Sequence, residues 1–125
     1  MNINNSRILI VEDEPAIAQM YQYKLEQEGY VIALAINGKE GLDVINEFKP
    51  DLILLDLRMP VMSGDEMLEE LRSRQDGYAI KVIILTNISK DEAPQRLRFL
   101  DVDRYIVKAH HTPKQVVEVI RDVLK

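Results

Sequence analysis

The sequence contains no cysteine and no tryptophan, and it has only two phenylalanines in 125 residues. Without cysteine, the chain can form neither a disulfide framework nor a metal site built on thiolates. Its apolar stretches are far shorter than the roughly 20 residues of a membrane-spanning helix. The polar residues 1–6 do not have the basic-then-apolar order of a signal peptide. We therefore expect a cytoplasmic protein that does not contact a membrane.

Positive charge is also scarce, because 16 lysines and arginines stand against 21 acids and leave a net charge of −5. Direct nucleic-acid binding needs a basic face and is not expected of this chain. The length and the 46% of hydrophobic residues fit one globular domain. We assign residues 1–125 to that single domain, with a folded core over about residues 6–125.

Four short apolar runs are the most informative positive feature. They cover residues 8–11, 52–55, 82–85 and 105–107, and polar residues of different kinds follow them. Short apolar runs bounded by helical patterns are typical of buried parallel strands. The residues that follow the four runs are Glu12 and Asp13, Asp56, Thr86, and Lys108.

Strands and helices are expected to alternate along the whole chain. We predict strands at residues 7–11, 31–36, 52–55, 81–85 and 104–107, and helices at 15–28, 39–48, around 67–71, at 91–100 and at 112–124. Pro94 suits only the first turn of a helix, so the fourth helix either starts late or is weak. The five strand–helix units predict an α/β fold with a doubly wound parallel sheet.

Carboxyl ends of parallel strands meet at one edge of the sheet, where ligands bind in such folds. Glu12, Asp13 and Asp56 crowded there would share either a proton or a metal ion. An all-oxygen set suits Mg²⁺. The alternative is that each acid is only a helix cap or a turn former.

Asp56 stands alone after its strand, so we expect it to be a nucleophile that can form an acyl phosphate. Lys108 can contact a phosphate oxygen, or form a plain ion pair with Asp56. Thr86 can donate a hydrogen bond to a phosphate oxygen, or form a local bond with the backbone.

This ordered set of residues resembles the receiver domain of bacterial response regulators over nearly the whole chain. The resemblance rests on Glu12-Asp13, Asp56 with Met59-Pro60 and Gly64, Thr86, and the segment from Asp103 to Lys108. It implies a (βα)5 flavodoxin-like fold with strand order 2-1-3-4-5.

The resemblance also implies roles for individual residues. Asp56 would accept a phosphoryl group from a sensor histidine kinase or a histidine phosphotransfer protein. Thr86 and Tyr105 would be switch residues, and Lys108 would contact the phosphoryl group. Mg²⁺ would be bound by Glu12, Asp13, Asp56 and the backbone carbonyl of Arg58.

The output of such a domain would be a change in the surface of the fourth helix, fifth strand and fifth helix, read by an unknown downstream protein. We expect no enzymatic activity beyond accepting and losing the phosphoryl group. Val119 replaces an arginine used by one dimerising class, which favours a monomer or a weak dimer. The two ends of the sequence favour a single-domain regulator.

Three positions depart from the family pattern. Ala109 replaces a proline that often follows a cis bond, so we expect a trans bond here. Asn87 replaces a small residue, and Asp101 stands where a glycine is usual. We also expect Arg58 and Ile88 to alter the rate of dephosphorylation.

Three other functions remain as alternatives. A phosphorylation-independent binding module could keep this fold. An aspartate-nucleophile phosphatase would need a second aspartate where the chain has Arg58. A flavin or nucleotide binder would need a Gly- or Ser/Thr-rich phosphate loop in place of the acidic segment at residues 12–14.

Overall fold

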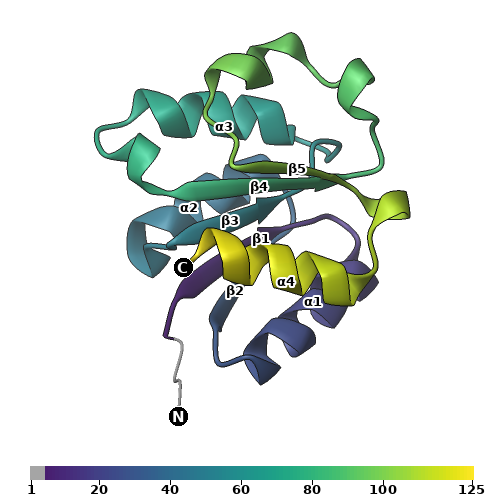
Figure 1. Ribbon diagram of the computed structural model, residues 1–125. Coiled ribbons are helices and arrows are strands. Elements are labelled where there is room, and N and C mark those ends of the chain that lie inside the picture. Colours follow the sequence, from purple (N-terminus) through teal and green to yellow (C-terminus); the bar gives the residue numbers. More distant parts are fainter. Residues whose placement is uncertain (1–4) are drawn as a thin grey trace.

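The computed structural model describes residues 5–125 and contains a sheet of five parallel strands in the order β2-β1-β3-β4-β5 (Figure 1). The strands are β1 (Arg7–Val11), β2 (Val31–Ala35), β3 (Leu52–Leu55), β4 (Lys81–Thr86) and β5 (Arg104–Val107). The predicted α/β fold and strand order are therefore confirmed. The sequence suggested that Thr86 follows the fourth strand. In the structure, Thr86 is instead the last residue of β4.

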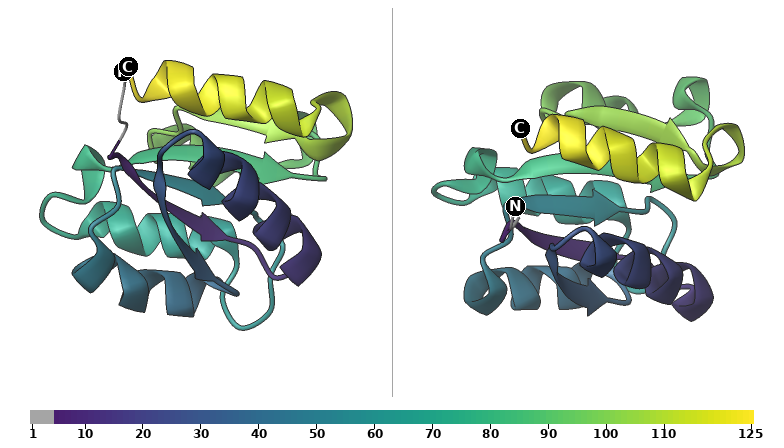
Figure 2. Two further views of the ribbon diagram at one scale, coloured as in Figure 1. Left: turned by 90° about the horizontal axis from the view of Figure 1, so that it is seen from below. Right: turned by 60° about the horizontal axis from the view of Figure 1, so that its bottom comes forward.

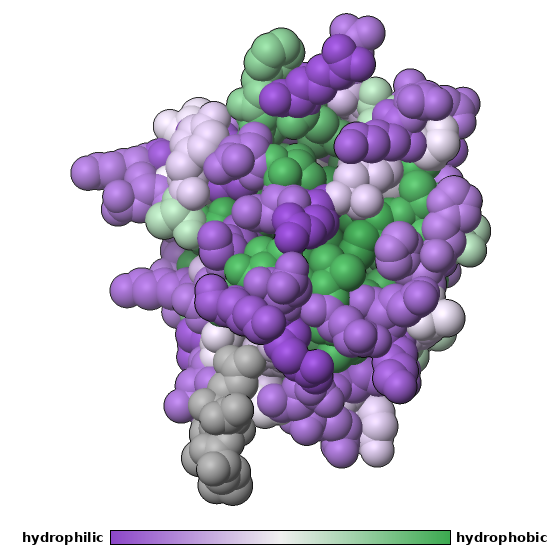
Figure 3. Space-filling model, in the orientation of Figure 1, coloured by the Kyte–Doolittle hydropathy of each residue, from purple (hydrophilic) through white to green (hydrophobic). Residues whose placement is uncertain are grey.

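Four α-helices cover the two faces of the sheet among the described residues (Figures 1 and 2). They are α1 (Pro15–Gln27), α2 (Gly38–Phe48), α3 (Gly64–Ser73) and α4 (Pro113–Val123). α1 and α4 pack on one face, and α2 and α3 pack on the other. Neighbouring strand residues such as Ile8 and Leu9 point to opposite faces, so both faces of each central strand are buried. The face that carries α1 and α4 shows mostly polar side chains, with apolar atoms visible between them (Figure 3).

The prediction of an α-helix over residues 91–100 is wrong. This segment forms two short 3₁₀ helices, η2 (Lys90–Glu92) and η3 (Gln95–Phe99), separated by Ala93 and Pro94. Proline has no backbone N–H and clashes with the preceding turn, so it prevents a continuous helix here. The helix predicted at residues 112–124 is therefore α4, the last helix of this structure.

Helix ends follow local signals in the sequence. Ser63 and Glu66 form a reciprocal capping box at the start of α3, and Thr112 and Gln115 form another at the start of α4. Each box satisfies backbone donors that a helix leaves free at its first turn. Thr112 is the cap of α4, and Pro113 occupies the first turn, where proline costs no hydrogen bond.

Arg72 organises the amino-terminal side of β4 and β5. Its side chain is buried and donates hydrogen bonds to the backbone carbonyls of Gly77, Ile80, Leu100 and Asp101 at 2.6 to 2.8 Å. Its guanidinium also lies 5.0 Å from the centre of the Tyr78 ring. One side chain therefore connects α3 to the loops that precede β4 and β5.

Two of the expected departures can be checked in the backbone. Asp101 has a φ of 54°, the left-handed conformation for which glycine is better suited. The residues described in the structure have no cis peptide bond, so the bond before Ala109 is trans, as expected. None of the helices in residues 5–125 is long and apolar enough to span a membrane.

Candidate functional site

The polar residues at the carboxyl ends of four strands meet at one edge of the sheet, as predicted. Val11 pairs in register with Leu55, which places Glu12 and Asp13 beside Asp56. Thr86 pairs with Val107, which places it beside Lys108. The sheet therefore brings acids, a hydroxyl and an amine together from four strands.

Lys108 bridges two buried carboxylates in this site. Its Nζ lies 2.8 Å from Oε1 of Glu12 and 3.3 Å from Oδ2 of Asp56. Glu12 and Asp56 are only 4% and 7% exposed, so both charges are largely removed from water. The predicted ion pair of Lys108 with Asp56 is present, and the shorter contact is with Glu12.

Burial and charge shift the pKa values of Glu12 and Lys108. Burial raises the pKa of the Glu12 carboxyl, and the hydrogen bond from Lys108 only partly offsets this effect. Burial alone would lower the pKa of Lys108. The hydrogen bond to Glu12 and the charge of Asp56 outweigh burial, so the pKa of Lys108 is raised and the amine stays charged.

The backbone fixes one oxygen of each buried carboxylate. The Leu57 N–H donates to Oδ1 of Asp56 at 2.7 Å, and the Glu14 N–H donates to Oε2 of Glu12 at 3.1 Å. The other oxygen of each carboxylate faces Lys108. Asp56 is thus held in one orientation, with Oδ2 toward the ammonium group.

Gly64 allows the loop after β3 to pass close to Asp56. A Cβ atom at position 64 would lie 2.1 Å from the backbone oxygen of Asp56, a distance no real contact allows. The Gly64 N–H also donates to the carbonyl of Leu57 at 3.0 Å. The start of α3 is therefore packed directly against the backbone of Asp56.

Glu12, Asp13 and Asp56 form a group that could hold a metal ion. Each offers one carboxylate oxygen, and these atoms lie within 4.8 Å of one another. A set of only oxygen ligands with few carboxylates fits Mg²⁺, which keeps several of its own waters.

Thr86 and Tyr105 both contact the segment that follows β4. Oγ1 of Thr86 accepts a hydrogen bond from the Ile88 N–H at 3.4 Å, which is the local backbone bond considered as an alternative above. The Tyr105 hydroxyl donates to the carbonyl of Ile88 at 2.7 Å. Burial, and then the charge of Asp56, raise the pKa of Tyr105, so its hydroxyl remains a donor.

A cavity of about 320 Å³ opens beside Asp56. Its walls include Asp56, Arg58, Thr86, Glu92 and Lys108. Glu92 was not among the residues predicted for the site. Ser89 Oγ donates to Glu92 Oε1 at 3.0 Å, and a serine three residues before a glutamate is a spacing that could have drawn attention to it.

Comparisons with known proteins agree with this geometry. Residues 8–121 match the family model described as the response regulator receiver domain. The chain is 35% identical over 90% of its length to the phosphate regulon transcriptional regulatory protein PhoB of Rhizobium meliloti, and covers 50% of that protein. It is 34% identical over 97% of its length to the alkaline phosphatase synthesis transcriptional regulatory protein PhoP of Bacillus subtilis, and covers 49% of that protein.

Solved structures give the same result at the level of the fold. The crystal structure of a CheY-like response regulator receiver domain protein from Methanospirillum hungatei JF-1 matches with a TM-score of 0.84 and 34% identity, covering 97% of this chain and 94% of that one. The chain spans about half the length of the curated relatives named above. By sequence match, strand order and the arrangement of its strand ends, this chain belongs to the response regulator receiver domain family of two-component systems.

Proposed function

We propose that Asp56 accepts a phosphoryl group from the phosphohistidine of a sensor histidine kinase or a histidine phosphotransfer protein. The observation that carries this proposal is the environment of Asp56. Its carboxylate is buried, is held by the Leu57 N–H and by Lys108, and faces a cavity that Thr86 also lines. A carboxylate fixed in this way is oriented to attack phosphorus.

In the proposed reaction, one carboxylate oxygen of Asp56 forms a bond to phosphorus while the bond from phosphorus to the donor histidine nitrogen breaks. The histidine leaves as an imidazole, and Asp56 becomes an acyl phosphate. Lys108 stays charged and offsets the negative charge that arrives with the phosphoryl group. Oδ2 is the oxygen nearest to this cation.

We also propose that Glu12, Asp13 and Asp56 hold Mg²⁺ together with the backbone carbonyl of Arg58. The spacing of the three carboxylates supports this assignment. When bound, the ion would neutralise charge on the acids and on the phosphoryl oxygens.

The response of the protein is proposed to begin at Thr86. The Thr86 hydroxyl accepts a hydrogen bond from the Ile88 N–H and would donate its own proton to a phosphoryl oxygen, and Tyr105 is bonded to the same segment. A new charge coupled to a loop in this way can change the neighbouring surface. The surface next to this loop is made of η2, η3, β5 and α4, which we call the output surface and expect a downstream protein to read.

Further expectations remain part of this proposal. The domain would act on no external substrate, would be cytoplasmic, and would be a monomer or a weak dimer. The relatives named above are transcriptional regulators, but the net charge of −5 argues against DNA contacts by this receiver domain itself.

The proposal is tested by incubation with Mg²⁺ and acetyl phosphate, followed by mass spectrometry of the intact protein. Wild type should gain the mass of one phosphoryl group, and D56N should gain none. D76N, which changes an exposed acid away from the site, should behave as wild type. No gain on wild type would overturn the proposal and favour a phosphorylation-independent binding module.

A further inference from the structure

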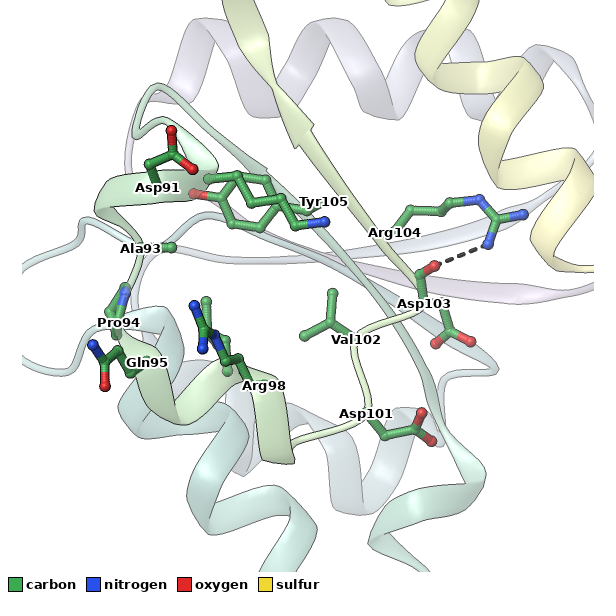
Figure 4. Close-up of a pocket in the computed structure, with 12 residues that line it drawn as sticks. Asp91, Ala93, Pro94, Gln95, Arg98, Asp101, Val102, Asp103, Arg104 and Tyr105 are labelled. Atoms are coloured by element: carbon green, nitrogen blue, oxygen red, sulfur yellow. Dashed lines mark hydrogen bonds between the residues drawn. The ribbon is translucent and has the colours of Figure 1, made fainter.

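Two tyrosines are packed on opposite faces of the sheet close to the acceptor site. Tyr105 packs on the face that carries α2 and α3, and its ring lies along a cavity of about 840 Å³ beside β5 (Figure 4). Tyr21 is part of α1 and packs on the face that carries α1 and α4. The reaction proposed above gives a role to Tyr105 and none to Tyr21.

The side chain of Tyr21 is buried beneath the acidic site. It is 5% exposed, and it lines a cavity of about 10 Å³ together with Glu12 and Asp56. A space of this size holds one water molecule at most, so the side chains around it lie close together. Burial raises the pKa of the Tyr21 hydroxyl, the charge of Lys108 lowers it and the charge of Glu12 raises it. The net effect is a raised pKa, so the hydroxyl keeps its proton and can donate a hydrogen bond.

This hydroxyl is not committed to a partner in the protein. Within residues 5–125, Tyr21 donates no side-chain hydrogen bond to another residue. Every fully enclosed side-chain nitrogen or oxygen in the same part of the chain has a partner, so the Tyr21 hydroxyl keeps some contact with solvent. Because a buried tyrosine usually places its hydroxyl against a partner, a proton is available here for a group that comes to need one.

Glu12 is the neighbour whose partner would change in the proposed reaction. Its Oε2 accepts from the Glu14 N–H at 3.1 Å, and its Oε1 accepts from Lys108 at 2.8 Å. Once Asp56 carries a phosphoryl group, Lys108 would turn toward the new oxygens and leave Oε1. A buried carboxylate that loses its donor destabilises the protein unless another donor replaces it. Of the two buried carboxylates, Glu12 is the one whose charge acts on the Tyr21 hydroxyl.

We propose that Tyr21 is a positioning residue of the acceptor site, which donates a hydrogen bond to Glu12 when Lys108 turns from Glu12 to the phosphoryl group. Tyr21 acts through Glu12 and does not contact phosphorus. The movement of Lys108 rests on the proposed function, whereas the bond from Tyr21 to Glu12 can be tested without it.

A double-mutant cycle in the unphosphorylated protein tests that bond. Y21F removes only the hydroxyl, and K108M imposes the loss of the ammonium group from Glu12. In urea unfolding without divalent cations, Y21F should lower the folding equilibrium constant less than about two-fold in wild type and about three- to ten-fold in K108M, as expected for one hydrogen bond. Y23F, at an exposed position of the same helix, should have little effect in either background.

The difference between the two backgrounds decides the result, because a purely structural role of the hydroxyl would cost the same in both. Equal effects of Y21F in wild type and in K108M would therefore overturn the inference. K108Q also lacks the ammonium group and provides the same comparison if K108M does not fold.

Phosphorylation provides a second comparison. At one sub-saturating concentration of acetyl phosphate with Mg²⁺, the phosphorylated fraction of Y21F should be about three-fold lower than that of wild type, because Glu12 then lacks a donor. Y23F should match wild type. An unchanged fraction in Y21F would overturn the role of Tyr21 in the phosphorylated protein.

The two proposals fail in different ways. If the cycle shows coupling but acetyl phosphate adds no mass to wild type, the bond from Tyr21 to Glu12 stands and the phosphoryl-acceptor function falls. If mass is gained but the cycle shows no coupling, the acceptor function stands and the assignment of Tyr21 falls.

Discussion

The ammonium group of Lys108 lies 2.8 Å from Oε1 of Glu12, although 96 positions separate the two residues in the chain. The same ammonium group reaches Asp56, so a single cation offsets part of the charge of two buried carboxylates that repel each other. The stability of the strand ends and the charge state of the site therefore depend on one side chain.

Replacing Lys108 by methionine should destabilise the protein by about 1–3 kcal/mol at neutral pH, because Glu12 and Asp56 lose a buried hydrogen-bonding cation. Urea unfolding measures the change. The exposed Lys114 provides a control, and K114M should leave the unfolding midpoint unchanged. A wild-type midpoint for K108M would show that the two acids find other compensation.

Replacing Arg72 by methionine should cost about 3 kcal/mol, because four backbone carbonyls lose their donor and at least two of them are in buried surroundings. Hydrogen exchange should accelerate most at residues 97–103. Arg74 is close in sequence and half-buried, and R74M should have a much smaller effect. Similar losses in the two variants would contradict a specific role for the Arg72 guanidinium.

Replacing Gly64 by alanine should destabilise the fold by about 2 kcal/mol or more, since the new Cβ would overlap the Asp56 backbone. The rate of phosphorylation should fall as well, because the acceptor would be displaced. G41A is the matched control. There the nearest atom is the flexible end of Met67, so its cost should stay within about 1 kcal/mol.

The carboxyl of Glu66 should make the stability of the fold depend on pH in the acidic range. Hydrogen bonds from the Ser63 backbone and side chain lower the pKa of this carboxyl below its ordinary 4.5. A lowered pKa in the folded state means that the ionised carboxylate stabilises the fold above pH 4.5 and that this contribution is lost as pH falls through the folded pKa.

Thermal unfolding of wild type and E66Q checks this expectation. Glutamine keeps a hydrogen-bond acceptor but does not titrate, so wild type should be the more stable protein at pH 6 and the difference should disappear in acid. A difference that stays constant between these conditions would sink the assignment of the effect to ionised Glu66.

Much of the sheet and the site could be predicted from the sequence, because parallel strands buried on both faces are short apolar runs with little ambiguity. Their ends then place Glu12, Asp13, Asp56, Thr86 and Lys108 at one edge without further information. Asp101 could be singled out only through the resemblance to the family, in which a glycine is usual at this position.

Features that depend on distant parts of the chain could not be predicted. In the sequence, nothing distinguishes Arg72 from any other polar residue of a helix. Only the fold brings the carbonyls of Leu100 and Asp101 to its side chain. Pro94 indicated a weak helix over residues 91–100. The sequence did not indicate that this segment would form two short 3₁₀ helices.

Two short 3₁₀ helices, η2 and η3, stand where a regular helix would cover β5. We therefore expect the two edge strands of the sheet, β2 and β5, to differ in how cooperatively they unfold. β2 lies between the well-packed helices α1 and α2, whereas β5 has a regular helix on only one of its faces. Amide protons along β5 and η3 should therefore exchange through small local openings, while those of β1 and β3 exchange only when the whole domain unfolds. We therefore expect the margin beside Tyr105 to open most readily, and reshaping it to cost less free energy than moving Asp56 from its place in the sheet.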